Sequence, residues 1–159
     1  MFNDDESEDL PLSRAAEFLL DECRMVLPGI QALLGFQLIV VFNPGFDSKL
    51  DSVGQELHLA AIFLVAMAVA IVMAPAAYAR QTEPSKVTGK FIRISTRLLI
   101  LSMLPLALGI SIDFYLIAGV IVPRAASVLA VALFAFFVLL WFVLPRARAL
   151  QRLAGATDK

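Results

Sequence analysis

The chain has 159 residues, of which 60% are hydrophobic and 17% are charged, and its formal net charge is −1. Soluble domains are usually about half apolar and about a quarter charged, so this composition excludes an ordinary soluble protein and indicates a membrane protein. The one cysteine, Cys23, excludes an intramolecular disulfide.

The N-terminus is acidic, since five of the first nine residues are Asp or Glu. Such a segment has too little apolar surface to fold, so residues 1–12 are expected to be disordered. Ser13 is the expected N-cap of a short amphipathic helix over Arg14–Arg24 on the cytoplasmic side. Within that helix Glu17 and Asp21 lie one turn apart and share a face.

Four apolar runs follow, at residues 25–42, 57–79, 98–122 and 125–144. At about 1.5 Å per residue, each run can cross a hydrocarbon core of about 30 Å, although the first is close to the minimum length. Polar residues 43–56 separate the first pair, and only Pro123 and Arg124 separate the last pair. The sequence therefore predicts an all-α fold, a bundle of four transmembrane helices in one domain over residues 13–144, with a basic tail over 145–159.

The orientation of the bundle follows from a basic segment between the second and third runs. Residues 80–97 hold one acid and five bases, Arg80, Lys86, Lys90, Arg93 and Arg97. With this segment and both termini in the cytoplasm, eleven of the thirteen Lys and Arg residues lie inside, and only Lys49 and Arg124 lie outside. The positive-inside rule therefore predicts a membrane protein with both termini in the cytoplasm.

Four of these bases step by four, three and four positions and so share one helical stripe: Lys86, Lys90, Arg93 and Arg97. One interpretation is anchorage to anionic lipid headgroups, at about 1 kcal/mol per base. The other is a cytoplasmic clamp, in which Lys90 and Arg93 pair with Glu17 and Asp21 of the N-terminal helix. Nucleic acid is not expected as a partner, because orientation in the membrane already accounts for the bases.

Small residues indicate where the helices approach closely. Ala66, Ala70 and Ala74 step by four along the second run, which predicts that this face packs against another helix. Gly29 and Gly35 of the first run are interpreted as close-packing positions rather than as contacts to a ligand.

Three sequence motifs carry a resemblance to a known family. They are LPGIQALLGFQL in the first run, NPGF at the start of the next loop, and MAPAAYAR at the end of the second run. Together they resemble a family of small bacterial membrane proteins classed as a domain of unknown function, from about Glu17 to the end of the fourth run. Some members carry automatic names as sodium:proton antiporters, so the resemblance implies ion transport. The last motif commonly ends Tyr-His-Arg in that family; Ala79 replaces the histidine here, which weakens any role assigned to that position.

Asp113 is the one carboxylate inside an apolar run. A carboxylate near the middle of a membrane costs about 2.5–3.5 kcal/mol to insert, so it normally faces a partner or a water-filled path. Two registers are open. A third helix that starts at Leu98 puts Asp113 inside the membrane at the depth of Gln31, whereas a start at Phe91 puts Asp113 at the outer boundary.

Gln31 and Gln37 of the first run are the polar groups expected to accompany Asp113 in a candidate ion or proton site. Alternatively they join helices through side-chain hydrogen bonds, worth about 0.6–2 kcal/mol each. The sole histidine, His58, is expected to be a solvated residue at the outer boundary rather than a pH sensor.

No pattern indicates an enzyme, a cofactor or a metal. Thr88-Gly89-Lys90 lacks the upstream glycine of a phosphate-binding loop, and one histidine with one cysteine cannot build a transition-metal site. Together with the resemblance, the sequence favours an integral protein of the bacterial inner membrane, and the resemblance implies that it moves protons or monovalent cations as a homo-oligomer. The alternative is a membrane scaffold that transports nothing.

The predicted orientation can be tested by labelling single cysteines with a membrane-impermeant thiol reagent in intact cells. Cysteines at positions 51 and 124 are expected to react from outside, and cysteines between positions 80 and 97 only after the membrane is opened. Labelling of position 51 exclusively from the cytoplasmic side would contradict four spans with both termini inside.

Overall fold

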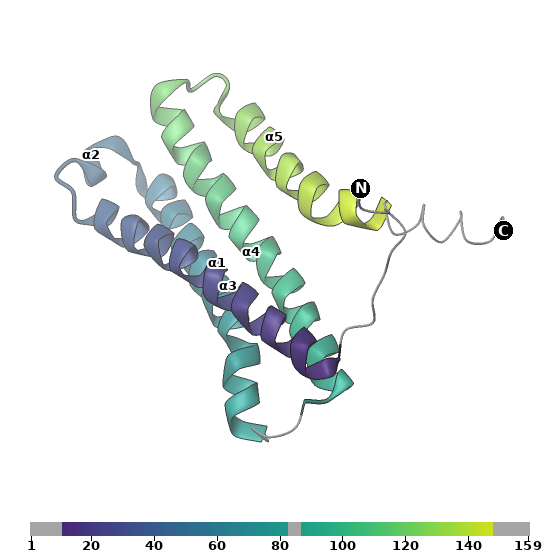
Figure 1. Cartoon of the computed structure of the whole chain (residues 1–159). Helices are drawn as coiled ribbons and strands as arrows, with labels where there is room; N and C mark the ends of the chain where they lie inside the picture. The colour runs from purple at the N-terminus through teal and green to yellow at the C-terminus, as the bar shows by residue number, and fades with distance from the viewer. Residues whose placement is uncertain (1–10, 83–86, 148–159) are drawn as a thin grey trace, which may run out of the picture.

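The computed structural model describes residues 11–82 and 87–147, and this part of the chain is helical with no strand. Its elements are α1 (Leu12–Val41), α2 (Phe46–Lys49), α3 (Ser52–Thr82), α4 (Gly89–Ile121), α5 (Ala126–Val138) and a π-helical turn, η1 (Leu139–Val143). Helices α1, α3 and α4 lie against one another, and α5 runs back along α4 on the side away from α1 (Figure 1). The predicted all-helical class is confirmed.

Four helices are long and apolar enough to cross a membrane, at Leu12–Val41, Ser52–Gln81, Gly89–Ile121 and Ala126–Ala147. Large apolar side chains such as Phe36, Phe63 and Val131 are about two-thirds exposed. Exposure on this scale would be very unfavourable in water, whereas lipid tails accept it without cost. The prediction of four helices able to span a membrane is therefore confirmed by length and composition.

Helix α1 is continuous from Leu12 through Pro28 to Val41, so the prediction of a separate short helix over residues 14–24 is wrong. Pro28 removes one backbone hydrogen bond, but the helix does not end there. Its buried residues lie on one stripe that crosses the proline: Ala16, Leu19, Cys23, Ile30 and Gln37. The same packing face therefore continues on both sides of Pro28.

Helix α4 begins at Gly89, nine residues before the apolar run predicted from the sequence. Its start is fixed by Thr88, whose hydroxyl oxygen accepts a hydrogen bond from the backbone N–H of Phe91 at 3.2 Å. Asp113 therefore lies about 36 Å along the helix, toward the end that carries α2. Of the two registers considered, the structure is close to the one that starts at Phe91.

The closest helix contact joins α3 to α4. Buried α3 residues are spaced by four, three and four along one face: Ala61, Val65, Ala68 and Val72. The predicted small-residue stripe lies on another face, since Ala66 and Ala70 are exposed and Ala74 is half-buried. That prediction is wrong because periodicity alone does not fix how a uniformly apolar helix is rotated about its axis.

Gly109 on α4 is the glycine that allows this close contact. A Cβ atom built there would lie 2.9 Å from Cγ2 of Val65 and 3.1 Å from the backbone oxygen of Ala61. By contrast, a Cβ at Gly29 or Gly35 would meet nothing within 4 Å, so the close-packing role predicted for those two residues is wrong.

Substitution of Gly109 tests this contact. Gly109→Ala is expected to destabilise the bundle by about 1–3 kcal/mol, because neither the short Val65 side chain nor a backbone carbonyl can move easily out of the way. Unfolding of the purified protein by increasing SDS in mixed micelles measures the change. Gly119→Ala is the matched control on the same helix, since a Cβ there meets nothing within 4 Å and alanine favours helix. Equal stability of the two variants would contradict the assignment.

Candidate functional site

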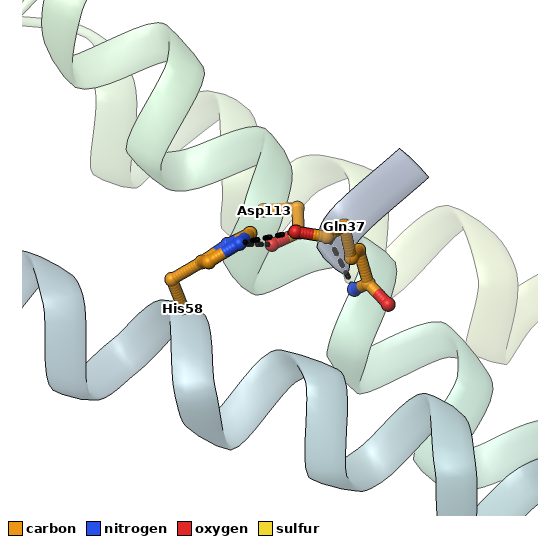
Figure 2. A network of polar contacts seen from close by, with 3 residues as sticks. All are labelled: Gln37, His58 and Asp113. Atoms are coloured by element: carbon orange, nitrogen blue, oxygen red, sulfur yellow. Dashed lines mark hydrogen bonds and ion pairs between the residues drawn. The ribbon is translucent and has the colours of Figure 1, made fainter. Parts of the chain in front are cut away.

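Three helices each supply one polar side chain to a cluster below α2. Gln37 comes from the last two turns of α1, His58 from the second turn of α3, and Asp113 from the final third of α4. These residues are far apart in sequence but meet in the folded chain, as Figure 2 shows. We refer to Gln37, His58 and Asp113 as the polar cluster.

The imidazole ring of His58 lies between two oxygen atoms. Its Nδ1 is 3.1 Å from Oδ1 of Asp113, and its Nε2 is 3.0 Å from the backbone carbonyl oxygen of Gln37. The Gln37 side chain donates a hydrogen bond from Nε2 to Oδ2 of Asp113 at 2.5 Å. His58 and Gln37 are buried, at 6% and 4% exposure, and the Asp113 side chain is 16% exposed. The cluster is therefore almost fully withdrawn from solvent.

The two contacts of the ring determine how many protons the cluster holds. A neutral imidazole has one N–H, whereas both ring nitrogens of His58 face oxygen atoms. Both contacts are hydrogen bonds if the ring is a cation beside an ionised Asp113. They are also hydrogen bonds if a protonated Asp113 donates to Nδ1 while Nε2–H donates to Gln37. Either arrangement contains two protons on the His58–Asp113 pair and has no net charge.

Loss of one proton changes this balance. A neutral ring beside an ionised carboxylate can donate to Asp113 or to Gln37, but not to both. The other contact then places two lone pairs against each other, and the pair carries one negative charge. A buried unpaired charge is expensive in an apolar surrounding, so the deprotonated cluster needs a compensating cation or a change in the helix contacts.

Charged groups around His58 are few in the described part of the chain. A cavity adjoins His58 between α1 and α4, and the charged residues that line it are Asp113 on α4 and Lys49 on α2, of which Lys49 is exposed. From α2, the Phe46 ring packs against His58 with centroids 5.7 Å apart. On α3 itself the neighbouring acid Glu56 is exposed. Asp113 is therefore the charge that dominates the environment of the ring.

Gln37 also carries an unsatisfied atom. Its side-chain Oε1 is buried and, within the described residues, has no hydrogen-bond partner. A buried acceptor left unpaired costs about 1–3 kcal/mol. Its presence next to a carboxylate and a backbone carbonyl gives the cluster more oxygen acceptors than donors.

The structure brings together two of the three residues predicted for this site. Asp113 and Gln37 are in contact, but Gln31 is exposed. Six residues separate the two glutamines, which places them about 120° apart around an α-helix, so one helix cannot present both to the same neighbour.

His58 was expected to be solvated, and that prediction is wrong. Its burial has a signal in the sequence, because positions 58, 61, 65, 68 and 72 alternate by three and four and form the buried face of α3. A histidine that continues such a stripe at its outer end belongs to the packed face rather than to the lipid- or water-exposed one.

The predicted cytoplasmic clamp is not formed by the side chains that the structure describes. No ion pair there joins Glu17 or Asp21 to Lys90 or Arg93; Asp21 instead contacts Arg24 at 3.3 Å on its own helix. Lys86 of the basic stripe lies outside the described residues. In this part of the chain there is also no group of three or more His, Cys, Asp or Glu residues that could hold a metal.

Comparisons with known proteins give a family but no activity. A family model described as a family of unknown function (DUF6328) matches residues 5–145. Comparison with curated proteins and with solved structures finds no match. The family match therefore assigns no chemistry to the polar cluster.

If His58 and Asp113 act as one unit, their substitutions will not add. His58→Ala or Asp113→Ala alone is expected to cost about 2–5 kcal/mol, because each leaves a buried partner unpaired. The second substitution is expected to cost much less once the first is made, giving a coupling energy above about 1 kcal/mol in SDS unfolding.

Gln31→Ala provides the control for this cycle, because Gln31 lies on the same helix as Gln37 but is exposed. Combined with His58→Ala it is expected to give additive losses. Additive losses of stability for His58→Ala and Asp113→Ala would show that the two side chains contribute independently to the free energy of unfolding. That result would contradict the view that they share two protons as one pair.

Proposed function

Because the chain belongs to a family of unknown function, DUF6328, which supplies no activity to transfer, we propose a function from the polar cluster. The protein is an integral membrane protein that binds and releases a proton at the His58–Asp113 pair. It uses this exchange to move protons or monovalent cations across the bacterial inner membrane, as a homo-oligomer.

The observation that carries the proposal is the position of the His58 ring between two acceptor oxygens. The pair is neutral and fully hydrogen-bonded only with two protons, so release of one proton creates a negative charge in a nearly dry site. A monovalent cation that enters would restore neutrality. Exchange of a proton for a cation at one carboxylate is the elementary step of an antiporter.

The depth of the polar cluster supports access from one side. His58 lies six residues after the start of α3, and Asp113 lies eight residues before the end of α4. These positions correspond to about 9 and 12 Å from the helix ends. With the basic ends of α3 and α4 in the cytoplasm, as the positive-inside rule predicts, the cluster lies close to the outer boundary of the membrane.

Helix α5 supports the oligomeric part of the proposal. Ala126 and Ala130 are buried against the bundle, whereas Val128, Val131 and Phe136 are more than half exposed. This outward face is apolar along its length and offers a second copy a surface on which to pack.

The alternative is a scaffold in which the same contacts only hold helices together. The contact between Nε2 of His58 and the backbone of Gln37 favours it, because it joins α1 to α3 and requires no proton exchange. The two functions differ in one respect that can be measured: a scaffold moves no ion.

Flux through proteoliposomes distinguishes the two functions. The wild-type protein is expected to move protons, reported by a pH-sensitive dye inside the vesicles, when gradients of Na⁺, K⁺ or H⁺ are imposed. Asp113→Asn keeps the shape of the side chain but cannot exchange a proton, so it is expected to abolish the coupled flux while the helical content stays unchanged.

Asp47→Asn is the matched control, because Asp47 is an exposed acid on α2 that does not belong to the polar cluster. It should transport like the wild type. If the Asp113→Asn variant moves protons as fast as the wild type, Asp113 is excluded as the group that exchanges the proton. A wild-type protein that moves no proton or cation under any of the gradients would favour the scaffold.

A further inference from the structure

A cavity of about 660 Å³ adjoins the polar cluster, between α1 and α4 and beneath α2. Its walls are largely apolar and aromatic, with Leu33, Phe36, Phe46, Ile110, Phe114 and Ile117 among the lining residues. All three members of the polar cluster also line it. Its size is within the range of about 300–1,000 Å³ typical of sites for drug-sized molecules.

One side of this cavity's mouth is apolar, although the exposed Asn43 and Lys49 also line the cavity. Phe36, Ile117 and Val120 line it and are themselves 68%, 59% and 54% exposed, so they contact lipid when the helices span a membrane. A molecule can therefore enter from the bilayer without crossing a polar rim. A molecule that enters the cavity by this route must be largely soluble in lipid.

The charge of the occupant follows from the walls. Asp113 retains 16% side-chain exposure, against 7% for His58, so the carboxylate is the more accessible member of the ion pair. Lys49 also lines the cavity, but it is an exposed side chain on α2, where water weakens its field. The carboxylate acts from an apolar environment, in which electrostatic attraction is much stronger.

The rings add to this preference for a cation. Phe36, Phe46 and Phe114 all line the cavity, and the negative face of an aromatic ring attracts organic cations. Apolar walls, three phenyl rings and one accessible carboxylate together match a molecule with a bulky apolar body and a single positive charge.

We propose that this cavity binds lipophilic organic monocations, which replace one proton of the His58–Asp113 pair. The inference rests on the proposed function and names its substrate class. The charge balances: the pair with two protons is neutral, one proton leaves to water, and the entering cation neutralises the negative charge that remains. One proton is therefore released for each cation bound.

Two ions of the same shape and opposite charge provide the test: tetraphenylphosphonium as the cation and tetraphenylborate as the anion. Binding of each to the purified full-length protein in detergent is measured calorimetrically in buffers of different ionisation enthalpy, which also counts the protons released. Tetraphenylphosphonium is expected to bind more tightly than tetraphenylborate and to release one proton. In the pH range where the His58–Asp113 pair of the free protein holds both protons, the affinity for tetraphenylphosphonium should rise about tenfold per pH unit.

Two variants separate the charge from the walls. Asp113→Asn is expected to lose at least tenfold in tetraphenylphosphonium affinity together with its pH dependence, whereas Asp47→Asn should bind like the wild type. Phe114→Ala is expected to weaken cation binding severalfold while each bound cation still releases one proton, so it tests the cavity even if Asp113→Asn folds poorly.

The failures of the two proposals can be told apart. Proton-coupled flux that requires Asp113, without any displacement of a proton by tetraphenylphosphonium, would overturn the substrate class and leave the proposed function standing. Tighter binding of tetraphenylborate would assign the cavity to an anionic amphiphile held by Lys49. Equal binding of both ions, unaffected by Asp113→Asn, would reduce the cavity to a nonspecific apolar groove.

Discussion

A polar atom buried away from water must find its hydrogen-bond partner within the protein. His58 is buried and has two ring nitrogens, and both face oxygens, one on α4 and one on the backbone of α1. The ring of His58 therefore links α3 to α4 and to α1 at the α2 end. Both links are hydrogen bonds when the His58–Asp113 pair holds two protons, and only one of them is a hydrogen bond when it holds one.

Close packing between α3 and α4 limits how far these two helices can move when the protonation of the pair changes. Gly109 holds α4 against Ala61 and Val65 of α3, a contact with no room for even one added carbon atom. Helix α1 has no comparable contact at Gly29 or Gly35, where an added Cβ would meet nothing within 4 Å. Helix α1 also packs against α3 and α4 less extensively than these two helices pack against each other. The cavity lies between α1 and α4.

The sequence predicts the four spans because a bilayer requires long apolar runs whatever the packing inside. It predicts side-chain partners less well, because they depend on helix rotation and register. Helix α4 starts at Gly89 through the Thr88 cap, which the apolar run starting at Leu98 does not reveal. Gln37 and Gln31 are equally polar in the sequence, yet only Gln37 faces Asp113. The three- and four-residue spacing of α3 does extend to His58, a signal that its place near the end of an apolar run obscures.

The central claim is that His58 and Asp113 form one electroneutral unit that exchanges a single proton. The chain contains one histidine, so ¹⁵N-labelled histidine reports on His58 alone. Solid-state NMR of lipid-embedded protein, with ¹³C-labelled aspartate assigned through Asp113→Asn, can follow both groups across the pH range in which the protein stays folded. The account predicts that the His58 ring nitrogens and the Asp113 carboxyl carbon change together in one transition that releases one proton. A ring that keeps a single protonation state throughout, or two groups that titrate independently, would contradict it.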